Sequence, residues 1–311
     1  MKFDEIKIGL DRPDLNQKIR VAIANIPLSD DNVEASYLRR AIVSRSRLKP
    51  FASLLNEIST YRTDAGEKID LVVFPEVSIP HIWEPMVVAW ARRHNIGVIA
   101  GLEHRVNSKG EAINEVIAAL PYRMESSHVA CVPIKRVKKF YSPEEKFILE
   151  NEYLKVPDSS NVPFQLFRWR GASFSIYNCF ELTSIEYRGI FKGRVDFIVA
   201  TEFNKDVNYF SNIMEAASRD IHCYIVQVND SCFGDSRVIS PSKTDKMNPL
   251  RIKGGDNLTF LTTVLDLEAL RVHQRKDYGL QKDSPNFKTT PPDFDRRLVE
   301  ERTSLGHIRI G

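Results

Sequence analysis

Short runs of apolar residues recur along the chain, and their length suits buried β-strands. In the first half they cover residues 20–26, 69–75, 96–101, 115–120 and 128–137. We expect the last two to pair as a hairpin. Uninterrupted apolar runs of this size are typical of strands that are buried on both faces.

The second half repeats this pattern, with strands expected at residues 174–177, 195–200, 223–228 and 259–265. Between the strands, apolar residues recur with helical spacing. This spacing predicts helices over residues 52–61, 86–93, 183–191 and 212–221. Buried strands that alternate with helices favour a layered α/β architecture.

The composition changes after about Lys276. Pro, Asp, Lys and Arg become frequent, and residues 289–292 read Thr-Thr-Pro-Pro. This composition is typical of chain that crosses a surface without regular structure. We therefore predict a single domain over residues 1–275 and an extended C-terminal arm over residues 276–311.

Three segments carry side chains suited to catalysis. In the first, residues 70–76, an apolar strand runs into Pro75 and Glu76. The carboxyl end of a strand is where α/β folds build ligand sites. Taken alone, however, the segment is more simply interpreted as a solvated acid at a strand end.

The second segment, residues 137–145, is rich in lysine, and alone it would be a solvated surface loop. Lys135, Lys138 and Lys139 all lie in or near it. We select Lys138, which stands five residues before Pro143 and seven before Glu145.

In the third segment, residues 174–181, a strand ends at Cys179 and a helix is expected shortly afterwards. The amino end of a helix would favour the thiolate form of a cysteine at this turn. The simpler interpretation is a small, buried and inert cysteine, which describes most single cysteines.

Taken together, Glu76, Lys138 and Cys179 occur in an order that resembles the carbon–nitrogen hydrolase (nitrilase) superfamily. The resemblance covers residues 20–267. It implies an α/β fold built as a four-layer αββα sandwich, and it assigns residues 1–275 to a nitrilase-like domain. It also implies a Glu–Lys–Cys triad.

Weaker agreements extend the resemblance, and departures from it concern the substrate. Asn114 and the segments 224–229 and 234–241 resemble family positions. By contrast, residues 217–220 read Ala-Ser-Arg-Asp where the family usually has Arg-Ala-x-Glu. Residues 201–204 read Thr-Glu-Phe-Asn without the common Pro and Trp.

The resemblance implies an amidase-type hydrolase that cleaves non-peptide carbon–nitrogen bonds of amides, carbamoyl compounds or nitriles. Cys179 would attack and form a thioester, with Glu76 as the base. Lys138 and the backbone N–H of Phe180 would stabilise the oxyanion. Glu145 would act as a second acid. The same triad also serves acyl transfer in this family, so transfer stays open.

Three side chains are expected in the substrate pocket, namely Tyr141, Glu202 and Phe203. Glu202 hints at a basic or amine-bearing substrate. No cofactor and no metal are expected, because the triad suffices for the chemistry. The resemblance also implies a homodimer or a higher homo-oligomer.

Alternative functions have less support in the sequence. Cys179, His222 and Asn229 occur in the order of a papain-like protease, but the residues around Cys179 lack that family's local pattern. The histidines and cysteines lack the spacing of zinc ligands. An inactive nitrilase-fold module for interaction or assembly also stays open.

The composition argues against several further classes of protein. Among 311 residues, 44 are Lys or Arg and 41 are Asp or Glu, so the net charge of +3 argues against a nucleic-acid partner. No apolar stretch approaches the roughly 20 residues of a membrane span. The amino end does not resemble a signal peptide, and the four cysteines suggest no disulfide framework. We therefore expect a cytoplasmic protein without a membrane partner.

Overall fold

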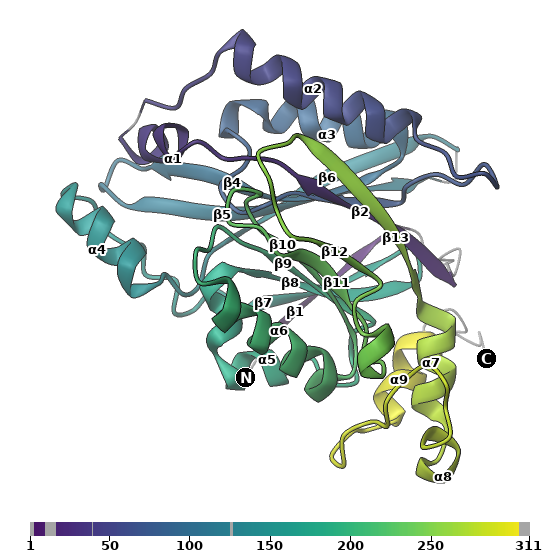
Figure 1. The fold of residues 1–311 in the computed structure, drawn as a ribbon. Helices are drawn as coiled ribbons and strands as arrows, with labels where there is room; N and C mark the ends of the chain where they lie inside the picture. Colours follow the sequence, from purple (N-terminus) through teal and green to yellow (C-terminus); the bar gives the residue numbers. More distant parts are fainter. Residues whose placement is uncertain (1–2, 10–16, 39, 125–126, 305–311) are drawn as a thin grey trace.

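The computed structural model describes residues 3–9, 17–38, 40–124 and 127–304. Their strands form two sheets (Figure 1). The first sheet has seven strands, in the spatial order β1 (Phe3–Ile8), β7 (Phe164–Trp169), β8 (Ala172–Asn178), β9 (Phe197–Thr201), β10 (Tyr224–Val228), β11 (Ser236–Ile239) and β12 (Leu250–Ile252). The second has six, in the order β13 (Thr259–Asp266), β2 (Lys18–Asn25), β3 (Leu71–Val73), β4 (Gly97–Val106), β5 (Ala112–Arg123) and β6 (Val129–Val137).

Helices cover the outer face of each sheet. The second sheet packs against α2 (Arg45–Thr60) and α3 (Glu84–His94), and α1 (Asp30–Tyr37) lies beside β4. The first sheet packs against α5 (Ile185–Gly189) and α6 (Val207–Ile221). The remaining helical segments are η1 (His81–Trp83), α4 (Pro143–Asn151), η2 (Cys179–Thr183), η3 (Thr244–Lys246), α7 (Leu267–Arg275), α8 (Tyr278–Gln281) and α9 (Arg297–Ser304).

The largest apolar core lies between the two sheets. Val21 of β2 and Phe174 of β8 belong to the same buried cluster, so the inner faces of the sheets pack on each other. Separate clusters join each outer face to its helices. On α6, for example, Phe210, Met214 and Ile221 are buried at helical spacing. The predicted four-layer αββα sandwich is confirmed.

Strand direction brings distant parts of the chain to one edge. Strands β8, β9 and β10 are parallel, and Asn178 pairs with Thr201, which in turn pairs with Val228. The residues that follow these strands therefore leave the sheet side by side. Likewise, β2, β3 and β4 are mutually parallel in the second sheet. Both sheets can thus contribute residues to one site.

The local predictions are confirmed in most places and refined in others. Strands β5 and β6 pair antiparallel, as the predicted hairpin requires. The helix expected over residues 183–191 is instead a short 3-10 turn, η2, followed by α5. The analysis of apolar runs missed β1, because this edge strand alternates half-buried with exposed residues.

The C-terminal segment differs from the extended arm that its composition suggests. Within residues 276–304 the chain forms α8 and α9, and α9 packs against α7 (Figure 1). Arg302 is fully buried and donates to the carbonyl oxygens of Gly193 and Val195, at 2.7 and 2.9 Å. It also lies 3.3 Å from Asp196. The buried Arg302 thus helps to anchor a mostly polar segment, together with the buried Val299 and Phe287.

Within the described residues, the structure contains no helix that is both long enough and apolar enough to cross a membrane.

The anchoring of α9 gives a test of the fold. Arg302→Leu should lower the free energy of unfolding by about 3 kcal/mol, because it leaves buried carbonyl and carboxylate groups without their cation. Arg297→Leu on the same helix is the control, since the Arg297 side chain is 83% exposed, and it should change stability by less than about 0.5 kcal/mol. Urea denaturation measures both. Equal effects of the two substitutions would show that α9 is not anchored in this way.

Candidate active site

The first carboxylate, Glu76, lies on a tight loop after β3. The backbone of the loop contacts β4 at Gly101, where an added Cβ would come within 2.4 Å of the Glu76 Cα. Gly101 also donates to the carbonyl of Pro75, at 3.0 Å. The next residue, Val77, has φ of 48°, a strained value for a β-branched side chain. Only glycine at position 101 lets the loop approach closely enough to direct Glu76 inward.

Cys179 occupies a similar sharp turn on the other sheet. It follows β8 directly, is 8% exposed, and has φ of 49°. Strain of this kind in a non-glycine residue persists only where the surrounding structure holds it. Here the buried carboxylate of Glu181 holds the turn, because it accepts a hydrogen bond from the backbone N–H of Asn178 at 2.7 Å.

The third predicted residue, Lys138, joins two carboxylates. Its ammonium donates to Glu76 Oε1 at 2.8 Å and to Glu145 Oε2 at 2.6 Å. The Lys138 side chain is 2% exposed. Glu145 lies in the first turn of α4, where it forms a capping box with Ser142. The sequence Ser-Pro-Glu-Glu therefore begins the helix and also presents Glu145 to Lys138.

Two asparagines link these groups across the sandwich. Asn114 donates to Glu76 Oε1 at 2.8 Å and to Glu145 Oε1 at 3.2 Å. Its own side-chain oxygen accepts from Asn178 Nδ2 at 2.8 Å. Asn178 immediately precedes Cys179, so a continuous chain of buried hydrogen bonds connects the cysteine turn with both acids.

A buried ion pair holds the cysteine turn to the lysine segment. Arg136 and Glu181 form two parallel hydrogen bonds, at 2.6 and 2.7 Å. Glu181 also accepts from the backbone N–H of Lys139 at 2.5 Å. Glu181, two residues after Cys179, thus has a structural role, since it fixes the backbone of both the cysteine turn and the lysine segment.

The electrostatics decide which groups carry charge. Burial alone would lower the pKa of the Lys138 ammonium, but Glu145 and Glu76 outweigh it and hold this pKa well above its usual value. Burial opposes ionisation of Glu145 as well, yet Lys138 lowers its pKa to about 2. At neutral pH, Lys138 is therefore a cation and Glu145 a carboxylate.

Cys179 behaves differently from the sequence-based expectation of a thiolate. Burial, and then the Glu76 carboxylate, raise the pKa of the Cys179 thiol well above its usual value. The element after it, η2, is a five-residue 3-10 turn with Cys179 at its first position, so no long helix dipole favours the thiolate. The resting cysteine is a thiol.

The structure distinguishes the three lysines that lie in or near residues 137–145. Lys135 points to the surface, where it contacts Glu84 at 3.0 Å. The Lys139 ammonium binds backbone carbonyls, including those of Ser160 and Val162. Of these lysines, Lys138 alone contacts Glu76 and Glu145.

The predicted pocket residues lie close to this centre. Tyr141 is buried, its hydroxyl lies between Ala112 O and Asn114 N, and its ring lies 5.5 Å from the Lys138 ammonium. The backbone N–H of Phe203 lies within hydrogen-bonding range of Cys179. Glu202 is fully buried at the end of β9. The structure thus brings all three near the proposed triad.

The papain-like alternative is not supported by the placement of its histidine. His222 precedes β10, whereas Cys179 follows the parallel strand β8, so the two lie at opposite edges of the sheet. The Nε2–H of His222 instead donates to the backbone carbonyl of Lys288, at 2.8 Å. Burial lowers the pKa of His222 to about 4. It is a structural histidine.

Within the described residues, no cluster of three or more His, Cys, Asp or Glu side chains is arranged to hold a metal ion.

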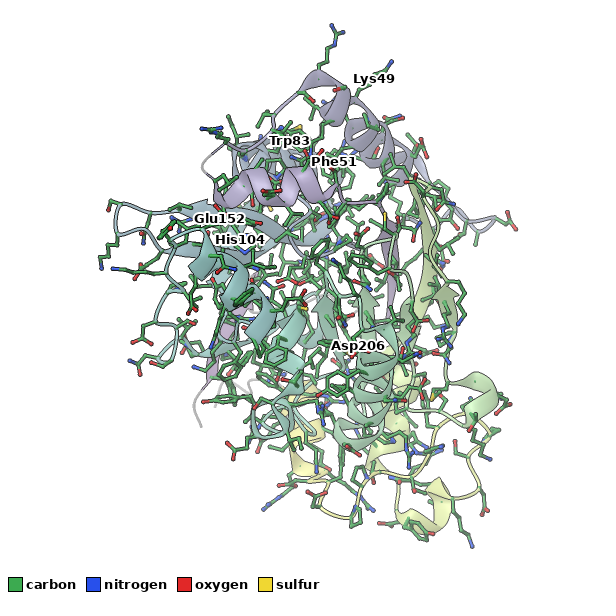
Figure 2. The ribbon with its side chains drawn as sticks, turned by 60° about the vertical axis from the view of Figure 1, so that its left-hand side comes forward. Lys49, Phe51, Trp83, His104, Glu152 and Asp206 are labelled. Carbon is green, nitrogen blue, oxygen red and sulfur yellow. The ribbon has the colours of Figure 1, made fainter. Side chains whose placement is uncertain are left out.

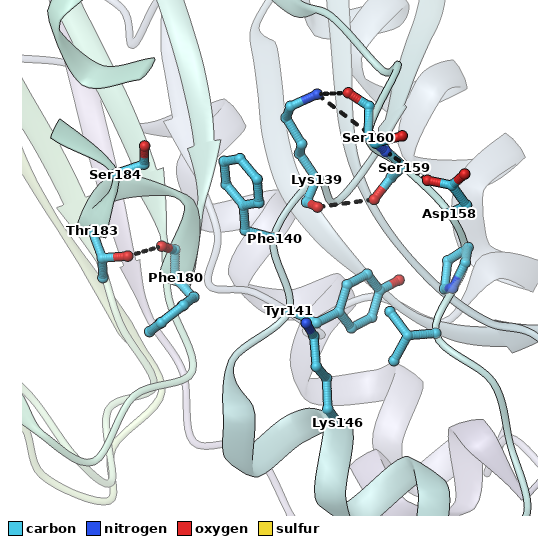
Figure 3. Close-up of a pocket in the computed structure, with 12 residues that line it drawn as sticks. Lys139, Phe140, Tyr141, Lys146, Asp158, Ser159, Ser160, Phe180, Thr183 and Ser184 are labelled. Carbon is cyan, nitrogen blue, oxygen red and sulfur yellow. Dashed lines mark hydrogen bonds between the residues drawn. The ribbon is translucent and has the colours of Figure 1, made fainter. Parts of the chain in front are cut away.

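Two cavities flank the centre. One, of about 480 Å³, has Phe180 and Tyr141 in its wall, with Ser159 and Thr183 among its polar groups (Figure 3). Another, of about 210 Å³, contacts Val77 and Trp83. Trp83 stacks on Phe51 of α2 (Figure 2). Residues adjacent in sequence to Cys179 and to Glu76 thus each border an open space.

Sequence reasoning missed several supporting residues. Arg136, His104 and Asn178 carried no signal, because each acts through a partner far away in the chain. The His104 ring contacts Glu145 Oε1 at 3.3 Å. Asn178 was visible only as the residue before Cys179.

Comparison with solved structures shows the class of fold, that of carbon–nitrogen hydrolases. No protein-family model matches the chain, and no curated protein sequence matches it. The CN-hydrolase superfamily protein XC1258 from Xanthomonas campestris, which carries an arsenic adduct in its active site, aligns with a TM-score of 0.56. That alignment has 15% identity and covers 87% of this chain and 98% of the other.

An amidase from Nesterenkonia sp., of the nitrilase superfamily, aligns with a TM-score of 0.54 and 14% identity, over 88% of this chain and 97% of its own. Its cysteine-to-alanine variant in complex with butyramide aligns with a TM-score of 0.55 and 14% identity, over 85% and 96%. In a further variant of that amidase, the acetamide moiety of fluoroacetamide is bound covalently to the active-site cysteine.

The thiol state of Cys179 gives a prediction about reactivity. With methyl methanethiosulfonate, a small reagent that is not an amide, Cys179 should react at least about tenfold more slowly than the exposed Cys232 at pH 7. Because its pKa is raised, Cys179 should react faster as the pH rises above 9. Peptide mass spectrometry measures both rates, with Cys232→Ala as the control. Preferential modification of Cys179 at pH 7 would show a resting thiolate.

Proposed function

We propose that the protein is an amidase-type hydrolase of non-peptide carbon–nitrogen bonds that acts through a Cys179 thioester. The observation that carries the proposal is the contact of Lys138 with Glu76, residues 62 positions apart, beside Cys179. A buried cation between two carboxylates stabilises a fold poorly compared with apolar residues of similar volume. Such an arrangement beside a strained cysteine favours a catalytic role.

In this mechanism, Glu76 takes the thiol proton as Cys179 attacks the carbonyl carbon. Both hydrogen bonds to Glu76 from the described residues fall on Oε1, which leaves Oε2 for the proton. The lysine has three N–H donors and uses two on carboxylates, so the third is free for the oxyanion. The backbone N–H of Phe180 would be the second donor.

The tetrahedral intermediate then collapses. Glu76 returns its proton to the leaving nitrogen, and the C–N bond breaks to give an amine or ammonia. Next, Glu76 removes a proton from water, the resulting hydroxide attacks the thioester, and Cys179 leaves with the proton. Glu145 holds Lys138 in place throughout. The solved amidase whose active-site cysteine carries a covalently added acetamide moiety supports, by analogy, the role of a cysteine nucleophile.

The substrate class in this proposal is a small amide, carbamoyl compound or nitrile. The amidase complex with butyramide supports the first of these. Assembly as a homodimer or larger oligomer belongs to the same proposal.

Matched lysine variants test the proposal. Lys138→Met should lower the rate of ammonia release from small primary amides by about 10²–10³-fold, because it removes an oxyanion donor. Lys135→Met, on the adjacent strand, removes a surface lysine and should leave the rate within about twofold. Absence of turnover in the unmodified protein across amides, carbamoyl compounds and nitriles would favour an assembly module instead. Equal rates in the two variants would contradict the role of Lys138 as an oxyanion donor.

A further inference from the structure

Glu202 is fixed at the point where the two sheets meet. It follows β9 directly, beside the end of β8 that carries Cys179, because Thr201 pairs with Asn178. Its backbone N–H donates to Val228 O at 2.8 Å, and its carbonyl accepts from the backbone N–H of Glu76 at 3.3 Å. The mechanism above assigns no step to Glu202.

Only one of the two carboxyl oxygens of Glu202 has a hydrogen-bond partner among the described residues. Its Oε2 accepts from Gln227 Nε2 at 2.9 Å. The amide oxygen of Gln227 accepts from Arg237 Nε at 3.0 Å, which fixes the amide so that it presents its N–H to the acid. The other oxygen, Glu202 Oε1, is buried and has no hydrogen-bond partner among the described residues. An unsatisfied buried carboxyl oxygen is costly, and it marks a place where a donor is missing.

The charges around Glu202 favour a cationic donor. Glu76 and Cys179 face it from the two strand ends, and Asp235 and Arg237 face it from the start of β11. Arg237 is already engaged by Glu215 at 2.8 Å.

The catalytic centre adds no free cation, because Lys138 lies between two carboxylates. Arg237 and Arg251 are likewise paired with Glu215 and Asp235, so each of these cations already has a carboxylate partner and none of them is left to pair with Glu202. A protonated amine is attracted to such a region, and an anion is repelled.

We propose that Glu202 recognises a protonated amine on the substrate, so that the reaction acts on a cationic amide. The inference rests on the proposed function for its reaction, but the binding site can be tested without turnover. The ammonium would donate to Oε1 and complete the hydrogen bonding of the carboxyl group. A neutral substrate of the same shape would leave that oxygen without a charge-assisted partner.

Binding of the amine should release a proton at pH 7, and this release can be measured. Burial and then the Glu76 carboxylate raise the pKa of Glu202 to about 8, against an opposing hydrogen bond from Gln227. At pH 7 the acid is therefore mostly protonated, and an arriving ammonium converts it to a carboxylate with release of one proton. At pH 9 the acid is already ionised, so the proton release should largely disappear.

The experiment uses the full chain with Cys179→Ala, which prevents chemistry. Isothermal titration calorimetry compares 5-aminopentanamide with hexanamide, and 4-aminobutanamide with pentanamide, which match in heavy atoms and differ in charge. We expect the cation to bind at least about tenfold more tightly in at least one pair. Titrations at pH 7 in buffers of different ionisation enthalpy should show release of close to one proton.

Two double variants provide the controls. Cys179→Ala with Glu202→Gln should lose the preference for the amine and the proton release. Cys179→Ala with Asp206→Asn removes an exposed acid four residues after Glu202, keeps a side chain that can cap α6, and should keep both the preference and the proton release. Thermal unfolding checks that each variant is folded, and Glu202→Asp, which retains the carboxyl group, should retain a preference.

The outcomes separate the two proposals. Equal binding of amine and neutral amide, no binding of either, or a preference that survives Glu202→Gln would overturn the amine site. An intact preference without turnover of any amide would refute the hydrolase and leave the amine site standing.

Discussion

The structure of the site depends on one interaction, the placement of the Lys138 ammonium between Glu76 and Glu145. A buried lysine loses its hydration, and only nearby carboxylates make its charged form stable. With both acids in contact, the ammonium stays protonated and holds each carboxylate in position. Burial and the Glu76 carboxylate keep Cys179 a thiol until a base removes its proton, although the Lys138 cation opposes them.

The two-sheet architecture explains how this interaction is built. Glu76 comes from the end of a strand in one sheet and Cys179 from the end of a strand in the other. The two strained turns at Val77 and Cys179 turn the chain sharply, and Gly101 makes the first of them possible. The Arg136–Glu181 pair then joins the lysine segment to the cysteine turn. These contacts hold the centre in a fixed geometry before any substrate arrives.

Much of the fold could be predicted from the sequence, because strands buried on both faces leave uninterrupted apolar runs. The edge strand β1 leaves no such run and was missed, whereas β6 and β13, the edge strands of the second sheet, were predicted. The helices of residues 276–304 were not predicted because they are short and mostly polar, and a few buried side chains, Arg302 and Val299 among them, hold them to the rest of the fold. No local pattern indicates which surface a distant arginine will reach.

From the sequence we predicted Glu76, Lys138 and Cys179 as one site, and the structure brings them together, but the sequence did not indicate their electrostatics. Three lysines competed in the sequence, and only the three-dimensional contacts distinguish Lys138 from Lys135 and Lys139. The thiolate expected from the following helix was wrong, because burial and then the carboxylate of Glu76, which comes from a remote segment, raise the pKa of the Cys179 thiol. The unsatisfied oxygen of Glu202 was equally invisible, since it depends on how Gln227 is oriented by a third residue.

The central claim is that this arrangement makes Cys179 a nucleophile toward acyl groups. The most direct measurement is the intact mass of the protein, quenched in acid during incubation with a small amide or the corresponding ester. The account predicts an added mass equal to the acyl group, located on Cys179 by peptide mapping and absent from Cys179→Ala. Unchanged mass for the wild-type protein while the substrate is consumed, or an adduct that persists in Cys179→Ala, would contradict it.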